Sequence, residues 1–152
     1  MLTEVCDFVH NYFELMYVND TFEIADGTIS LDFLKPGQRF RIVGSALNDG
    51  IYTYYDGGVI FDDDGKTGVT LATETFTGTV VAMGVPNAFL KIVQEISDWQ
   101  TANKAILDSP YTSESFGGYS YTKASGSGAN SGGTLTWQDK FRSRLNAYRK
   151  IA

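Results

Sequence analysis

The sequence predicts an α+β protein in which a small antiparallel β-barrel or sandwich is inserted between the first and second of three helices. Apolar residues recur at helical spacing over residues 3–18, 87–107 and 137–149. Between the first two of these segments, apolar and polar residues alternate instead, and turn-forming residues interrupt the alternation. A Tyr/Gly/Ser-rich stretch precedes the last helix, and we expect it to form a flexible loop.

The first helix is expected over residues 3–18, with Thr3 as its N-cap. Its apolar stripe comprises Val5, Val9, Tyr12, Phe13 and Met16. Charged and amide side chains occupy the opposite face, which is typical of a helix that packs one side against a core. We expect Asn19-Asp20 to end it.

Residues 20–85 are expected to form the β domain, with about six or seven short strands. Asp26-Gly27 is a signal for a two-residue hairpin, because both positions must adopt positive φ. Strand alternation is clearest at Ile29, Leu31 and Phe33, and again at Phe40 and Ile42. The flanking segments, 1–19 and 86–152, are predicted to form one helical core.

The second and third helices each have a recognisable start. Pro86 is predicted to open the second helix, because proline is best tolerated in the first turn. Thr136 can cap the third, with Asp139 three residues later. Between them, the run from Ala124 to Gly133 cannot pack a core and is expected to be mobile in an isolated chain.

The formal net charge is −6, and it is unevenly distributed. Residues 139–152 hold five basic side chains and one acidic one, which leaves −10 on residues 1–138. The acidic part should repel nucleic acid, whereas the basic segment could attract it locally. We favour the simpler interpretation that the basic run is a solvated helix face that complements the helix dipole.

No targeting or membrane signal is expected, because the first residues are acidic and no apolar run is long enough to cross a bilayer. The single cysteine, Cys6, excludes an internal disulfide and is expected to be a small buried residue.

Several motifs that could carry chemistry do not fit their patterns. Gly65-Lys66-Thr67 ends like a phosphate-binding loop, but Ile60 stands where that loop needs glycine. The preceding aspartates, 62–64, are consecutive rather than alternating, so an acidic turn is favoured over a calcium loop. His10 is the only histidine, and no nucleophile motif accompanies it. We therefore expect no enzyme activity, no cofactor and no metal.

A nucleic-acid-binding barrel is the alternative function from a different class. Tyr52, Tyr54 and Tyr55 could stack on bases if their rings were exposed. We favour the opposite interpretation, in which Tyr52 and Tyr54 share one face of the sheet and pack against a helix. The reason is that the barrel segment is acidic, whereas base-stacking proteins need a cationic groove.

Two stretches near the C-terminus resemble one family. The first is Ser113-Glu114-Ser115-Phe116-Gly117-Gly118-Tyr119-Ser120-Tyr121, and the second runs from Trp137-Gln138-Asp139-Lys140-Phe141 to Leu145-Asn146-Ala147-Tyr148-Arg149-Lys150-Ile151. Both are similar to the signature loop and closing helix of head–tail connector (adaptor) proteins of tailed phages. The resemblance covers residues 1–19 and 86–152, and the β segment is similar to an insertion seen in prophage members.

This resemblance implies a structural virion protein, assembled in the bacterial cytoplasm, that forms a ring below the portal protein. Such rings are usually twelve-fold, contact a tail-side neck protein, and let double-stranded DNA pass without reading its sequence. A neck or tail-completion protein is a close variant of this interpretation. The implied portal contacts are Arg142, Arg144, Tyr148, Arg149, Lys150 and Ile151, and the implied contacts between subunits are Phe116, Tyr119 and Tyr121.

Overall fold

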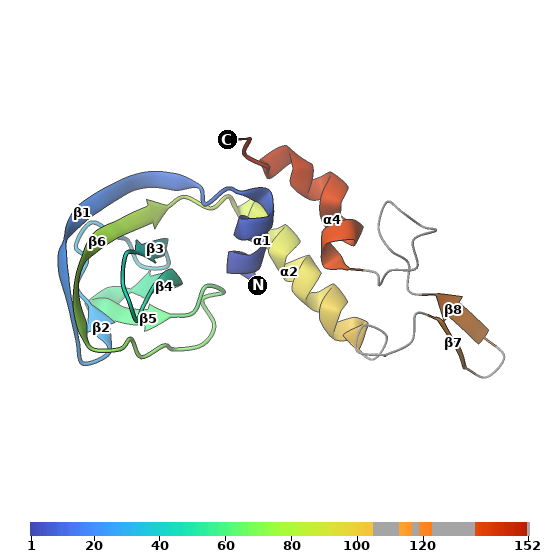
Figure 1. The fold of residues 1–152 in the computed structure, drawn as a ribbon, viewed down its shortest axis with the longest axis horizontal. Helices are drawn as coiled ribbons and strands as arrows, with labels where there is room; N and C mark the ends of the chain where they lie inside the picture. Colours follow the sequence, from blue (N-terminus) through green and yellow to red (C-terminus); the bar gives the residue numbers. More distant parts are fainter. Residues whose placement is uncertain (105–112, 117–118, 123–135, 152) are drawn as a thin grey trace. The chain divides into compact units, whose positions relative to one another are not determined.

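The protein has an α+β fold with a nearly closed antiparallel barrel of six strands and, in the part that the structure describes, three α-helices (Figure 1). The computed structural model describes residues 1–104, 113–116, 119–122 and 136–151. The chain forms two compact units, Met1–Asn87 (unit 1) and Ala88–Ala152 (unit 2). None of the described helices combines the length and apolar character that a membrane crossing requires.

Unit 1 contains one helix followed by the six barrel strands. These elements are α1 (Leu2–Val9), β1 (Glu14–Ala25), β2 (Thr28–Ile29), β3 (Arg39–Val43), β4 (Gly50–Tyr55), the 3₁₀ turn η1 (Asp56–Gly58), β5 (Val59–Phe61) and β6 (Glu74–Met83). Unit 2 contains α2 (Asn87–Ala102, which starts at the boundary), the hairpin β7 (Ser113–Phe116) and β8 (Tyr119–Thr122), α4 (Trp137–Leu145) and the 3₁₀ turn η2 (Asn146–Tyr148).

The barrel strands are ordered β2-β1-β6-β3-β4-β5, and every neighbouring pair is antiparallel. The two longest strands, β1 and β6, pair from Glu14 opposite Met83 to Ile24 opposite Glu74. Figure 1 shows them curving together around one side of the barrel. The two end strands, β2 and β5, approach each other, which nearly closes the sheet.

The core of unit 1 lies inside this curved sheet, because alternate residues of each strand point inward. Phe40 and Ile42 are buried in β3, as the alternation predicted. The buried cluster comprises Phe22, Ile24, Ile29, Leu31, Leu34, Phe40, Ile42, Ile60, Leu71, Phe76, Val80 and Ala82. Removing this apolar surface from water is the main force that holds the barrel together.

The prediction for the first helix was wrong at its N-cap, which is Met1 rather than Thr3, and beyond its first half. α1 ends at Val9 because His10 adopts a left-handed conformation with φ 53°, and the Asn11 N–H donates back to the Cys6 carbonyl at 3.1 Å. Residues 14–18 instead begin β1, where Tyr17 and Val18 pair with β6. Aromatic and β-branched residues suit a strand at least as well as a helix, and the long partner strand decides between the two.

The hairpin prediction at Asp26-Gly27 is confirmed, with φ values of 56° and 78°. The strand predicted through residues 29–33, however, stops at Ile29. Leu31 stays buried in an irregular segment, where its backbone carbonyl accepts a hydrogen bond from the Leu34 N–H. Cys6 is fully buried on α1, as predicted.

Unit 2 differs from its prediction mainly at the helix ends. α2 begins at Asn87, so Pro86 lies just before the helix rather than in its first turn. α4 ends at Leu145 and tightens into η2, whereas a helix was predicted to residue 149. Residues 105–107 of the predicted second helix and the run from Ala124 to Gly133 lie outside the described residues.

Candidate protein interface

The C-terminal helix α4 is held against α2 within unit 2 by its apolar stripe. Trp137, Phe141 and Leu145 are all buried, and the Phe141 ring lies edge-on to Trp99 of α2 with ring centroids 6.2 Å apart. The helix starts as predicted: the Thr136 hydroxyl oxygen accepts from the Asp139 N–H at 3.2 Å and its O–H donates to the Asp139 carboxylate at 2.8 Å. Sequence and structure therefore agree on this helix and its inward face.

Two of the implied portal contacts make ion pairs inside unit 2. Arg144 pairs with Glu95 of α2, and Arg142 pairs with Asp139 one turn earlier at 3.1 Å. About half of each arginine side chain remains exposed. Surface ion pairs of this kind contribute about 0–1 kcal/mol to stability. A carboxylate on a partner protein that binds the arginine more tightly could therefore replace either pair.

The other implied portal contacts follow at the end of the chain. The Tyr148 ring packs edge-on against Phe89 of α2, with centroids 5.1 Å apart. Arg149 adopts an extended conformation, Lys150 is exposed, and Ile151 is 91% exposed. The structure therefore separates an anchored aromatic from a short extended segment, residues 149–151, that carries two cations and one solvated apolar side chain.

The implied contacts between subunits fall on the β7–β8 hairpin. The antiparallel register places Phe116 opposite Tyr119 and Glu114 opposite Tyr121. The sequence had predicted only a flexible loop here. Within Ser113–Phe116 and Tyr119–Thr122, serine or threonine alternates with larger side chains, which is typical of strands.

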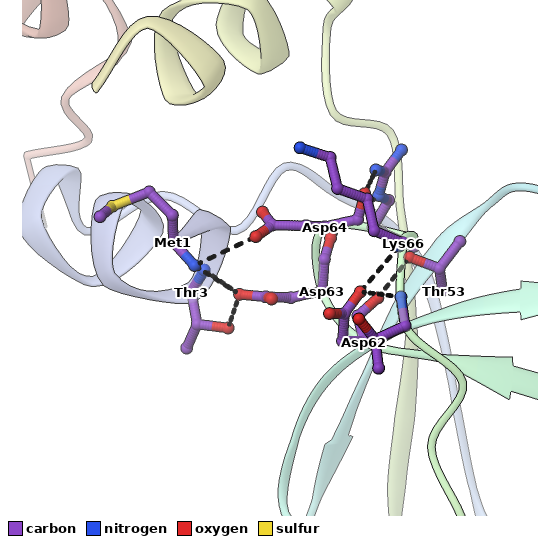
Figure 2. Close-up of polar contacts among 9 residues, drawn as sticks. Met1, Thr3, Thr53, Asp62, Asp63, Asp64 and Lys66 are labelled. Atoms are coloured by element: carbon purple, nitrogen blue, oxygen red, sulfur yellow. Dashed lines mark hydrogen bonds and ion pairs between the residues drawn. The ribbon is translucent and has the colours of Figure 1, made fainter. Parts of the chain in front are cut away.

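The aspartates at 62–64 form an acidic turn, as the sequence predicted (Figure 2). The carboxylate of Asp62 accepts the Lys66 and Thr67 N–H groups, at 2.9 and 3.3 Å. Asp63 accepts from both the backbone N–H and the hydroxyl of Thr3 at 2.8 Å, and it pairs with the Met1 ammonium at 3.5 Å. These contacts join the start of α1 to the barrel, so at least two of the three carboxylates have structural partners.

Burial alone would raise the pKa of Asp63, but the hydrogen bonds from Thr3 and the nearby ammonium outweigh it and lower that pKa below its ordinary value. A carboxylate with a depressed pKa stabilises the fold above its unfolded pKa, and this stability is lost as pH falls through the folded pKa. The stabilisation should therefore be complete at neutral pH and absent in strong acid.

Asp63→Asn is expected to lower the free energy of unfolding by about 1 kcal/mol at pH 7. The difference from the wild-type protein should shrink as pH falls below the ordinary aspartate range. Urea unfolding over a series of pH values measures it. Asp56→Asn, at an exposed position, is the matched control. This assignment would be contradicted if the difference in unfolding free energy between the wild-type protein and Asp63→Asn stayed constant from neutral to acidic pH.

A second polar cluster, around the turn between β3 and β4, gave no sequence signal. Asn48 is 3% exposed, and its amide bonds the Ala72 carbonyl, the Ala72 N–H and the Glu74 carboxylate at 2.8–3.0 Å. Glu74 also accepts from the Ser45 hydroxyl and from the Ala46 N–H, and the Ser45 contact is the main cause of its lowered pKa. The side-chain oxygen and nitrogen atoms of Asn48, Ser45 and Glu74 are all bonded within the protein, which is typical of a structural element rather than a reactive one.

The barrel tyrosines are engaged within unit 1. Tyr52 and Tyr54 pack against the core beside Phe40, and the Tyr52 hydroxyl donates to the Asn48 carbonyl at 2.8 Å. Tyr55 lies edge-on to Phe61, with centroids 4.8 Å apart. These contacts do not favour the alternative in which the three rings stack on nucleic-acid bases.

Within the described ranges, no three histidine, cysteine or carboxylate side chains lie close enough together to hold a metal ion. No protein-family model matches this chain, and no curated protein matches its sequence. The portal contacts implied by the resemblance lie on the surface of unit 2, on α4 and residues 148–151.

Proposed function

We propose that the protein is a non-enzymatic structural subunit of a tailed-phage or prophage particle, a head–tail connector that joins a ring below the portal. In this proposal residues 149–151 contact the portal protein, and the β7–β8 hairpin contacts the neighbouring subunit. The barrel is the element inserted into the helical adaptor. The similarity of residues 113–121 and 137–151 to the connector signature supports this assignment.

The observation that carries the proposal is the opposite charge of the two compact units. Unit 1 holds thirteen acidic and four basic side chains, a formal charge of −9. Unit 2 holds five acidic and eight basic side chains, a charge of +3. Such a subunit favours head-to-tail contacts, in which the basic unit of one copy faces the acidic unit of the next. A head-to-tail contact that closes produces a ring.

The same distribution suits a channel for DNA. An acidic barrel repels phosphate, so double-stranded DNA could pass it without binding. The basic unit would be neutralised by the portal and by the neighbouring copy. The ring, the tail-side neck protein and the location in the virion all belong to this proposal.

Binding to the portal encoded by the same phage or prophage tests the proposal. The triple variant Arg149→Glu/Lys150→Glu/Ile151→Ser should bind purified portal rings at least about tenfold more weakly, because it reverses the charge of the contact and removes its apolar anchor. Sedimentation and negative-stain microscopy measure the complex.

Lys91→Glu/Lys104→Glu provides the control, since it removes the same number of cations from exposed positions on α2 and just after it. It should keep near wild-type binding. Equal losses of portal binding in both variants would mean that binding depends only on the net charge of the protein. A wild-type protein that does not bind the portal would refute the proposal.

A further inference from the structure

The longest strand of the barrel has one edge with almost no partner. β1 pairs with β6 along its whole length, but on its other edge β2 pairs only with Ile24 and Ala25. In the part of the chain that the structure describes, residues 15–23 therefore meet no strand on that side. Edges of this length are usually shortened, covered or paired in soluble proteins, because their backbone groups can accept another chain.

The backbone geometry shows which groups this edge presents. In a two-residue hairpin the residues that flank the turn exchange their backbone hydrogen bonds, so the N–H and C=O of Ala25 face β2. Because these groups alternate along a strand, those of Asn19, Thr21 and Glu23 face the same edge. The Thr21 N–H donates to the Asp20 carboxylate at 2.7 Å, which agrees with an outward-facing donor.

A groove of about 520 Å³ lies along this edge. One wall is residues 18–25 of β1, and the other is residues 28–33, which comprise β2 and the irregular segment that follows it. Val18 and Phe33, both half-buried, contribute apolar surface to the groove. Further along the same strand, Leu15 and Tyr17 are 68% and 64% exposed. The edge thus offers both backbone hydrogen-bonding groups and apolar contacts.

The charge of the groove indicates what it accepts. Its lining includes three carboxylates, Asp20, Glu23 and Asp32, and no basic side chain. Two copies of β1 would bring like charges into register if they paired with each other, which is unfavourable in a sheet. A strand with lysine or arginine opposite these acids would instead be stabilised by attraction between the opposite charges.

We propose that the free edge of β1 binds an extended, cation-bearing segment of a partner protein, which adds to the barrel as a further strand. Main-chain hydrogen bonds to the edge give affinity, and the cations opposite the groove carboxylates give specificity. Because it concerns unit 1 alone, this inference does not depend on the ring or on portal binding.

A ten-residue peptide in which pairs of valine alternate with pairs of lysine, so that lysines lie on both faces of the strand, is the probe; it is blocked at both ends. In NMR titrations of the full chain, amide shifts should be confined to residues 15–25 and 28–33. Asp20→Lys/Glu23→Lys should weaken binding at least about tenfold, since it reverses two of the three charges. Glu4→Lys/Asp98→Lys makes the same change in net charge at exposed positions and should leave binding unchanged.

Two altered peptides separate the contributions. Glutamate in place of lysine should abolish binding, and N-methylation of alternate residues should abolish it by removing the donors on one edge. If Asp20→Lys/Glu23→Lys does not fold, Asp32→Lys alone, outside the strand, should weaken binding about threefold.

The inference is overturned if the valine–lysine peptide fails to bind at about 1 mM. Shifts centred elsewhere, or equal binding of the glutamate peptide, also overturn it. Sedimentation that shows self-association through β1 would overturn it as well, because the occupant would then be a second copy.

Discussion

Phe40→Ala is expected to lower the free energy of unfolding of unit 1 by about 3–5 kcal/mol, the usual cost of truncating a buried phenylalanine. The Phe40 side chain is fully buried. The centroid of its ring lies 5.7 Å from the ring centroid of Tyr52 and 6.2 Å from that of Tyr54. β3 pairs with β4 on one side and β6 on the other. Because both partners hold the backbone in place, the barrel cannot collapse into the cavity that alanine would leave.

Urea unfolding followed by far-ultraviolet circular dichroism measures this loss, and amide exchange in β3 and β6 assigns it to the barrel. Tyr17→Ala removes an aromatic ring that is 64% exposed and should change stability by no more than about 0.5 kcal/mol. A Phe40→Ala protein within about 1 kcal/mol of wild type would mean that this ring does not stabilise the barrel core.

Leu145→Ala is expected to release α4 from α2, with a loss of about 2–5 kcal/mol. The Leu145 side chain is fully buried at the last turn of α4. α4 has nine residues, too few to remain helical in water without packing. Residues 149–151 follow this helix directly, so the variant should also weaken any contact that they make.

Tryptophan fluorescence reports this change selectively, because both tryptophans, Trp99 and Trp137, lie in unit 2. We expect a red-shifted emission and a lower unfolding midpoint for this unit, with the barrel unchanged. Arg142→Ala, which removes a partly exposed ion pair, is the control and should cost about 0–1 kcal/mol. Unchanged emission from Leu145→Ala would show that α4 does not depend on this contact.

Elements with local signals were predicted well. Asp26-Gly27 needs positive φ at two successive positions, and few structures other than a tight hairpin provide it. Thr136 with Asp139 marks a helix start through hydrogen bonds that span only three residues. The buried faces of α2 and α4 follow from a period that matches the helix.

Elements decided by distant partners were predicted poorly. Residues 14–18 fit a helical stripe, yet Tyr17 and Val18 pair with Val81 and Val80, far along the chain. Residues 31–33 alternate like a strand, but no described strand pairs with them. The groove along β1 could not be predicted for the same reason, because residues 14–18 at the start of this strand were predicted to be helical.

The polar cluster around Asn48 illustrates a different limit. Asn48, Ser45 and Glu74 are common surface residues, and their spacing matches no motif. Their burial and bonding depend on β6 starting beside the turn between β3 and β4. The resemblance of residues 113–121 to a connector loop likewise concerns a segment whose predicted contacts are with other molecules.

The pairing of β1 with β6 also sets the order of events during synthesis. β1 leaves the ribosome long before its partner β6. Glu14 pairs with Met83 and Ile24 pairs with Glu74, and both partners are synthesised much later. Such non-local pairing slows folding to about the millisecond-to-second range. Until β6 emerges, the nascent chain exposes β1 with both edges open, a state in which aggregation competes with folding. We therefore expect the exposed apolar residues at the start of β1 to determine how strongly the protein depends on chaperones during expression.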